Sequence, residues 1–253
     1  MTVRPVVFLG PTLPAHAAAR VLDADYRPPA ARGDVHRAVR DGARMIGIVD
    51  GYFRQAPAVL HKEILWAIAE GAQVSGAASM GALRAAELDE FGMTGVGWVY
   101  RAFRDGRLTG DDEVAVAHGP AAAGYPAISE AMVNIRRTLA AAARAGVIGP
   151  EARARLAAAA KALYYPDRSW DRLLDTACGC GVAREAVAAL EAWLPEGRVD
   201  RKRADALVLL EHMAAVAADG AADGAASRRV AYAFEHTVFW QDVLDRAAAA
   251  PSP

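Results

Sequence analysis

A run of small residues around a single serine is the part of the sequence best suited to chemistry. The run spans residues 76–81 and reads Gly-Ala-Ala-Ser-Met-Gly. Small neighbours permit a sharp strand-to-helix turn that exposes a nucleophile, and Ala77-x-Ser79-x-Gly81 is a loose relative of the nucleophile elbow. The first amides of the following helix, at Met80 and Gly81, would face a developing oxyanion. The alternative is that Ser79 is a plain helix N-cap, a position where serine is favoured.

A lysine supplies a candidate base for this serine. All cations of the chain are arginines except Lys62, Lys161 and Lys202. Lysine can lose its proton in a suitable environment, whereas arginine cannot. Lys62 lies early in a predicted helix, on an apolar stripe that includes Trp66. Burial and the positive end of the helix both favour a neutral amine, which could activate Ser79. The alternative is a lysine at the edge of the core, paired with Glu63 or Glu87.

Two further loops follow predicted strands and are candidate binding loops. They read Gly10-Pro11-Thr12 and Asp50-Gly51-Tyr52. Ligands of open α/β sheets bind beyond the carboxyl ends of the strands, so both loops are expected to lie near the Ser79 turn. Arg84, which follows Ser79 on the next helix, could bind a carboxylate or position Glu87, although an ordinary ion pair is the default interpretation.

Metal chemistry has weak support in the sequence. The run Asp111-Asp112-Glu113 resembles a metal or partner-binding cluster, but acidic triplets of this kind are usually solvated caps. Cys178 and Cys180 offer too few ligands for a closed zinc site. The six histidines show no arrangement typical of a catalytic triad. We therefore expect neither a metal nor a cofactor.

The elements that must position these residues change character along the chain. Up to about residue 95, short apolar runs alternate with helical patterns, as in a parallel α/β unit. Strands are predicted at 6–9, 45–49 and 73–77, a loop at 26–31, and helices ending near 22 and at 34–40, 57–70 and 80–88. Later segments predict helices at 97–105, 128–145, 151–163, 170–178, 183–193, 200–218 and 229–246. The expected fold is an N-terminal parallel-sheet α/β unit, residues 1–120, followed by a mostly helical half, residues 121–253, packed with it as one globular body.

The composition and charge exclude some classes of function. Among 253 residues, 29 are Lys or Arg and 30 are Asp or Glu, which gives a net charge of −1. This balance lacks the basic footprint of a general nucleic-acid binder, so no nucleic-acid partner is expected. Hydrophobic residues make up 54 % of the chain, enough for a substantial core. No stretch approaches the roughly 20 apolar residues that cross a bilayer, and no signal-peptide pattern is evident, so we expect no membrane and a cytoplasmic location.

Taken together, these segments resemble the TfuA-like family, the companion proteins of YcaO enzymes in peptide-backbone thioamidation. The matching segments lie mostly in the first 135 residues and comprise 7–12, 47–53, 61–67, 76–88, 91–93, 112–116 and 127–131. The helical half matches more diffusely, chiefly around residues 202–206.

The resemblance implies a role in sulfur supply. In this family, the TfuA protein is understood to hydrolyse the C-terminal thiocarboxylate of a small ThiS-like carrier protein, to release sulfide to YcaO, and to help YcaO engage its peptide substrate. The resemblance implies a catalytic Ser–Lys pair, carried here by Ser79 and Lys62. Two alternatives remain open. One is a non-catalytic adaptor that docks YcaO and improves its binding of peptide, and the other is an ordinary Ser–Lys peptidase or esterase.

Overall fold

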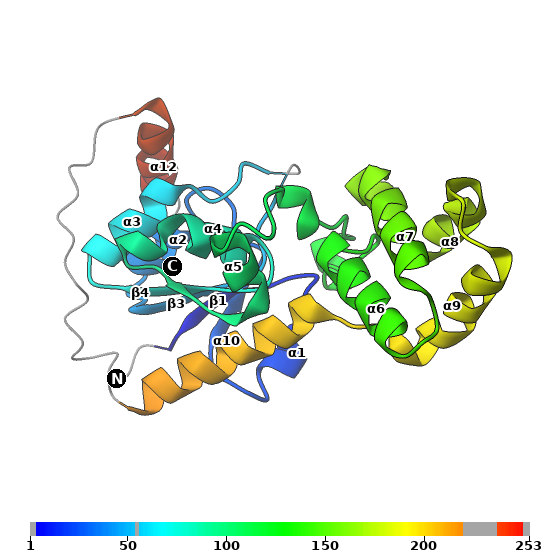
Figure 1. Cartoon of the computed structure of the whole chain (residues 1–253). Helices are drawn as coiled ribbons and strands as arrows, with labels where there is room; N and C mark the ends of the chain where they lie inside the picture. The colour runs from blue at the N-terminus through cyan, green and yellow to red at the C-terminus, as the bar shows by residue number, and fades with distance from the viewer. Residues whose placement is uncertain (1–3, 54–55, 220–236, 250–253) are drawn as a thin grey trace. The chain divides into compact units, whose positions relative to one another are not determined.

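The computed structural model describes residues 4–53, 56–219 and 237–249 (Figure 1). The chain divides into two compact units. Unit 1 contains residues 1–108 and 203–253, and unit 2 contains residues 109–202. Within the described residues, no helix has both the length and the apolar character to cross a membrane.

Unit 1 is built on a five-stranded sheet in which every pairing is parallel. The strands are β1 (Val6–Phe8), β2 (Asp25–Arg27), β3 (Met45–Ile48), β4 (Gln73–Gly76) and β5 (Thr94–Gly95), in the order β2-β1-β3-β4-β5. This order is one of the two common doubly wound arrangements, in which ligands bind where the strand order reverses, between β1 and β3. The expected α/β class is therefore confirmed.

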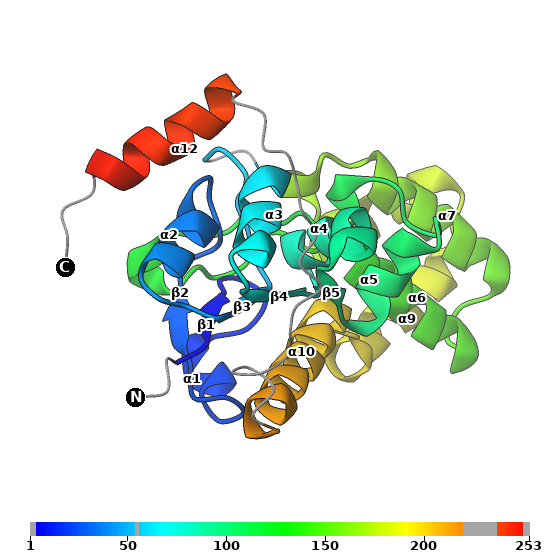
Figure 2. The same ribbon diagram turned by 90° about the vertical axis from the view of Figure 1, so that its left-hand side faces the viewer.

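Helices cover both faces of the sheet (Figure 2). The helices of unit 1 are α1 (Ala15–Ala18), α2 (Asp34–Arg40), α3 (His61–Ala69), α4 (Met80–Leu88), α5 (Gly97–Arg104), α10 (Arg201–Ala218, from residue 203) and α12 (Val238–Ala249). α2, α3 and α4 lie on one face, and α1 and α10 on the other. Because both faces are covered, the central strands β1 and β3 are continuous apolar runs. At Gly47 an added Cβ would lie 2.6 Å from the Met213 sulfur, so α10 packs directly on the backbone of β3.

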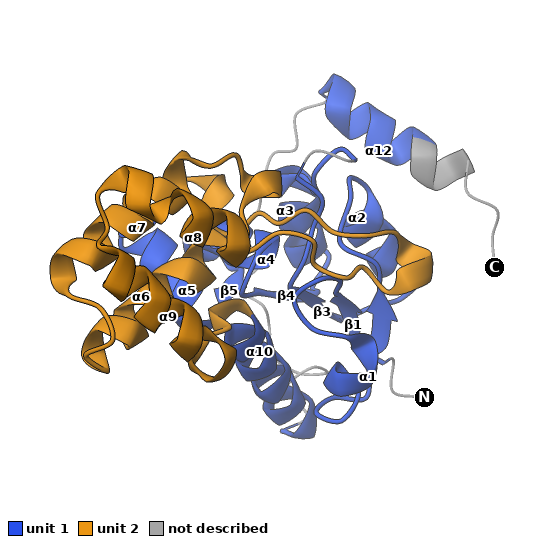
Figure 3. Ribbon diagram, turned by 90° about the vertical axis from the view of Figure 1, so that its right-hand side faces the viewer, with its two compact units in different colours: residues 1–108, 203–253 blue, residues 109–202 orange. Residues whose placement is uncertain are grey.

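Unit 2 is helical, as expected for the second half of the chain (Figure 3). It contains α6 (Met132–Arg144), α7 (Pro150–Ala162), α8 (Trp170–Ala177) and α9 (Arg184–Gly197), with short 3-10 turns at Asp111–Glu113, Ala121–Ala123, Tyr165–Asp167 and Cys178–Cys180. The apolar faces of the four helices meet in one core, which includes the fully buried Leu139, Leu156, Leu173 and Leu190.

Several boundaries differ from the sequence expectations, for physical reasons. Residues 25–27, in part assigned to a loop, form β2, which is possible because β2 is an edge strand and Pro28 and Pro29 follow it. β5, with two residues, is too short to show a pattern.

The start of α3 and the grouping of the last helices also differ. α3 begins at His61, not at residue 57, because the preceding segment is extended and the Pro57 carbonyl accepts a hydrogen bond from the Arg32 amide. α10 and α12, expected in the helical half, group with the sheet. The first part of the helix expected at 229–246 lies outside the described residues.

Candidate functional site

The serine of the small-residue run lies on a strained turn between β4 and α4. The Ser79 amide donates a hydrogen bond to the Ala77 carbonyl at 2.7 Å, which closes a three-residue turn around Ala78. Ala78 has a φ of 65°, one of two positive values among the described non-glycine residues. An alanine in this conformation costs about 1–3 kcal/mol, and such strain is concentrated at functional sites. Ser79 itself is 2 % exposed.

Ser79 occupies the N-cap position of α4, but its side chain makes no capping hydrogen bond. Ser169 provides the contrast within the same chain, because its hydroxyl accepts the Arg172 amide at 3.1 Å and caps α8. The simple capping role considered for Ser79 is therefore absent in the structure.

The glycines that flank the turn serve close packing. An added Cβ on Gly81 would lie 1.7 Å from the Ile48 carbonyl oxygen, and one on Gly76 would lie 2.1 Å from the Gly81 carbonyl oxygen. Neither approach leaves room for any side chain. The turn therefore packs against the carboxyl end of β3. The other predicted loops emerge at this same edge of the sheet.

The loops after β1 and β3 are held together by Asp50. This carboxylate is buried, and it accepts hydrogen bonds from the Gly10 amide at 2.9 Å, the Thr12 amide at 3.0 Å and the Thr12 hydroxyl at 2.6 Å. A Cβ on Gly51 would lie 2.7 Å from the Met80 Cγ, so the β3 loop also touches the start of α4. The structure therefore brings the three predicted strand ends together at one edge.

The same contacts reduce the number of backbone amides that could stabilise an oxyanion. The Gly10 and Thr12 amides are engaged by Asp50, and the Gly81 amide donates to the Val49 carbonyl at 3.3 Å. These amides are therefore not directed at a substrate in this structure. The Met80 amide, by contrast, donates to no backbone carbonyl among the described residues.

Pro11 and Tyr52 are the remaining residues of the two candidate binding loops. Both are half-buried, and the Tyr52 amide donates to the Ala30 carbonyl at 3.1 Å.

Lys62 is the second residue of α3, and the start of that helix is firmly anchored. The neighbouring Glu63 is fully buried, and its carboxylate accepts the Leu60 amide at 2.8 Å, the Gly33 amide at 3.0 Å and the Val35 amide at 3.2 Å. Burial raises the pKa of Glu63 to about 7, against the effect of these backbone donors. Lys62 is half-buried, as are Trp66 and the rest of its predicted stripe.

Arg84 and Glu87 form an ion pair that ties α4 to the start of α3. Arg84 Nη1 lies 2.7 Å from Glu87 Oε2, and Arg84 Nε donates to the Val59 carbonyl at 3.1 Å. His61 Nε2 lies 2.7 Å from the same carboxylate oxygen. Burial acts to raise the pKa of Glu87, but the hydrogen bond from His61 and the charge of Arg84 lower it overall. Arg84 and Glu87 thus form the ordinary ion pair that the sequence favoured for Arg84.

Comparison with known proteins identifies a similar family. Residues 50–169 match the family model of TfuA-like proteins. Over this segment, which comprises 120 of the 253 residues, the chain is similar to TfuA-like proteins. No curated protein matches the chain. The matched segment begins at Asp50 and includes Lys62, the Ser79 turn and the Arg84–Glu87 pair.

The TfuA-like segment continues into unit 2, where the acidic run proves structural. Glu113 is buried and receives Arg136 Nε and Nη2, each at 2.9 Å, and Lys161 at 2.9 Å. Arg168 Nη2 lies 2.9 Å from Asp112. Within the described residues, no three His, Cys, Asp or Glu side chains are arranged to hold a metal. The expectation of a solvated cap is wrong for Glu113, because its charge is neutralised by long cations from α6 and α7.

Two contacts in this TfuA-like protein were not expected from the sequence. The roles of Asp50 and His61 depend on approaches between distant segments, so no local pattern indicates them.

The argument that a rare lysine indicates chemistry is also weakened, because Lys161 is paired with Glu113 and buried Lys202 donates to the Val114 carbonyl at 2.8 Å. A retained lysine can therefore be structural here.

Proposed function

We propose that this TfuA-like protein releases sulfide from the C-terminal thiocarboxylate of a ThiS-like carrier protein and thereby supplies a YcaO enzyme. The observation that carries the proposal is the state of Ser79. Its hydroxyl is buried on a strained strand-to-helix turn, makes no capping hydrogen bond, and adjoins the Met80 amide. Strained turns of this kind are concentrated at functional sites, and a sharp strand-to-helix turn carries the serine in the nucleophile elbow.

The proposed reaction has two steps. Lys62 acts as the general base and takes the proton of Ser79 while the serine oxygen attacks the thiocarboxylate carbon. The Met80 amide stabilises the oxyanion, and the tetrahedral intermediate collapses with cleavage of the carbon–sulfur bond. Sulfide leaves with the proton held by Lys62. Water then hydrolyses the serine ester, which returns the free hydroxyl and leaves the carrier with an ordinary carboxylate. No cofactor takes part in this scheme, and the ATP of thioamidation belongs to YcaO.

In this proposal the neighbouring loops shape the entrance. A flexible carrier tail would enter the crevice between the β1 and β3 loops, where doubly wound sheets bind ligands. Asp50 fixes both loops, so the entrance is formed before the carrier binds. Arg84, first considered as a thiocarboxylate ligand, already binds Glu87 and the Val59 carbonyl. Its proposed role is to position α3, and with it Lys62, beside α4.

The second candidate is a non-catalytic adaptor for YcaO. The similarity to TfuA-like proteins and exposed apolar side chains in unit 2 favour it. Ile128 is 65 % exposed and Tyr164 is 52 % exposed, values that suit a docking surface more than a core. An adaptor requires neither Ser79 nor Lys62, so the same variants distinguish the two candidates.

The test is sulfide release from a thiocarboxylated cognate carrier by the purified protein. Ser79→Ala and Lys62→Ala should each reduce release by at least about a hundredfold, the lower range for loss of a nucleophile or base. Lys62→Arg keeps the charge but not the capacity to lose a proton, so it should be as inactive as Lys62→Ala. Ser169→Ala, which removes a capping serine in unit 2, is the matched control and should retain release.

Two results would contradict the hydrolase. One is release that persists in both Ser79→Ala and Lys62→Ala. The other is absence of release from the wild type with a carrier that a YcaO system accepts. If the variants also support thioamidation when sulfide is added, the adaptor becomes the better account.

A further inference from the structure

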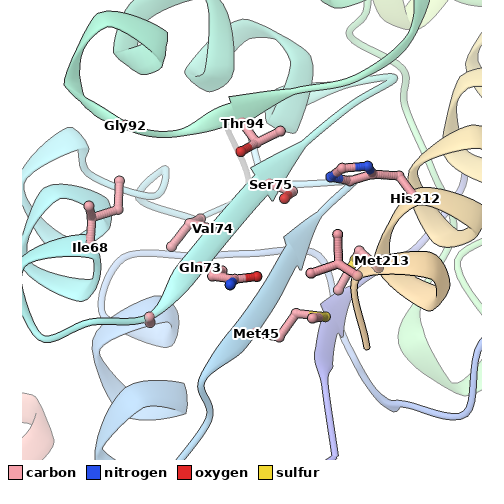
Figure 4. A pocket seen from close by; sticks show the side chains of 11 residues that line it. Met45, Ile68, Gln73, Val74, Ser75, Gly92, Thr94, His212 and Met213 are labelled. Carbon is pink, nitrogen blue, oxygen red and sulfur yellow. The ribbon is translucent and has the colours of Figure 1, made fainter. Parts of the chain in front are cut away.

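A cavity lies in unit 1 near the beginnings of β3 and β4, bordered by α10 and by Ile68 of α3 (Figure 4). Its volume is about 310 Å³, near the lower limit for small-molecule sites. The walls come from the beginnings of β3 and β4, from β5 and from α10, through residues that include Met45, Gln73, Thr94 and Met213. None of its lining residues belongs to the site proposed for sulfide release.

Three polar side chains converge at one end of this cavity: Ser75, Thr94 and His212 (Figure 4). Ser75 is only 7 % exposed, yet its hydroxyl has no hydrogen-bond partner among the described residues. Neither Thr94 nor His212 has a side-chain partner among these residues. The Ser75 hydroxyl is reached from the cavity and is not sealed in the core. Hydrogen-bonding groups that line an apolar cavity without a protein partner are the groups that orient a ligand there.

Apart from Gln73, the remainder of the lining is apolar. Met45, Met213 and Val216 face the cavity from the sheet and α10. The two methionines are flexible and adapt to ligands of irregular shape. No lysine or arginine lines the cavity, so a highly charged ligand such as a phosphate ester would lack compensation. The lining instead suits one compact polar head and a short apolar tail.

From these observations we propose that the cavity between β4, β5 and α10 binds a short aliphatic carboxylate, with its head on Ser75, Thr94 and His212. Two hydroxyl groups and an imidazole nitrogen can donate three hydrogen bonds to one carboxylate. The tail lies against Met45, Met213 and Val216. Thr94 is exposed, so the head is placed beside the mouth of the cavity, where it keeps partial contact with water.

Titration of the full-length protein with hexanoate tests the proposal, by calorimetry and by NMR of the histidine rings. Binding should have a Kd of about 1 mM or lower and should shift the His212 ring signals. His212→Leu and Ser75→Ala should each weaken binding by about tenfold, which is the effect of one lost charge-assisted hydrogen bond. Val216→Phe should fill the tail region and abolish binding.

1-Hexanol is the matched control ligand, because it has the same tail and a neutral head. It should bind at least about tenfold more weakly than hexanoate. Equal binding of both ligands would show that the cavity is a non-specific apolar site and would overturn the proposal. Absence of hexanoate binding would also overturn it, as would binding that His212→Leu and Ser75→Ala leave unchanged in proteins whose far-UV circular dichroism is native.

Discussion

Asp50 binds Thr12 twice, through the backbone amide at 3.0 Å and through the hydroxyl at 2.6 Å. The two residues are separated by 38 positions in the sequence and follow different strands. A single buried carboxylate thus connects the two loops at the point where the strand order reverses. The loops that were expected to bind substrate are first of all bound to each other.

Asp50→Asn should therefore lower the free energy of unfolding by about 1–3 kcal/mol, because an amide presents donors where Gly10 and Thr12 also donate. Thr12→Val removes only the hydroxyl and should cost about 1 kcal/mol. Urea unfolding measures both. A neutral Asp50→Asn would show that the loops hold their shape without this carboxylate.

The two serines at helix starts should respond differently to alanine. Ser169→Ala removes a capping hydrogen bond and should destabilise the protein by about 1 kcal/mol. Ser79→Ala removes no capping bond and should cost less, and under the proposed mechanism it should abolish sulfide release. Thermal unfolding of the two variants provides the comparison. Equal losses of stability would indicate that Ser79 supports α4 in the ordinary way.

Strain at Ala78 predicts a gain in stability on substitution. Ala78→Gly relieves about 1–2 kcal/mol of left-handed strain. Glycine also makes the unfolded chain more flexible, at a cost of about 0.4–1 kcal/mol. The net change should be a gain of about 0–1.5 kcal/mol in chemical denaturation. If the strain serves catalysis, sulfide release should fall in this more stable variant, and a destabilised variant would exclude strain at this turn.

His36 predicts how stability depends on pH. Its ring is buried against Trp66, at a centroid distance of 4.3 Å, and Nδ1 has no hydrogen-bond partner within the described part of the chain. Burial lowers the pKa of His36, and the charges of Arg40 and Arg37 lower it further, while Glu70 acts in the opposite direction. The unfolded chain therefore binds the proton more readily than the folded chain. Stability from this group should be complete above pH 6.5 and decline as the pH falls through that value.

The matched variant is His36→Phe, which keeps a ring beside Trp66 but cannot be protonated. Urea midpoints measured at pH 7.5 and pH 5.5 should differ less in the variant than in the wild type. The same difference in both proteins would assign the pH dependence to other groups.

The sequence predicted those features that depend on local chemistry. The bounds of α2 and α4 agree with the expected helices, and the three polar loops do end neighbouring parallel strands. The contacts between the loops were not predictable, because they arise from approaches across the fold. Asp50 was expected to face substrate but binds backbone, and Glu63, once considered as a partner of Lys62, accepts amides from the start of α2. Local patterns reveal which residues reach an edge of the sheet, but not which neighbours they meet there.

The return of the chain to the sheet through α10 has a consequence for synthesis. All five strands have been synthesised once residue 95 has been added, yet the side chains of Val7 and Met45 pack with Leu209 and Met213 of α10. Chains grow from the N-terminus, and domains generally fold as units during synthesis. The part of the sheet face that α10 covers therefore stays exposed while all of residues 109–202 are made. Unit 2 is able to complete its own core before unit 1 can close.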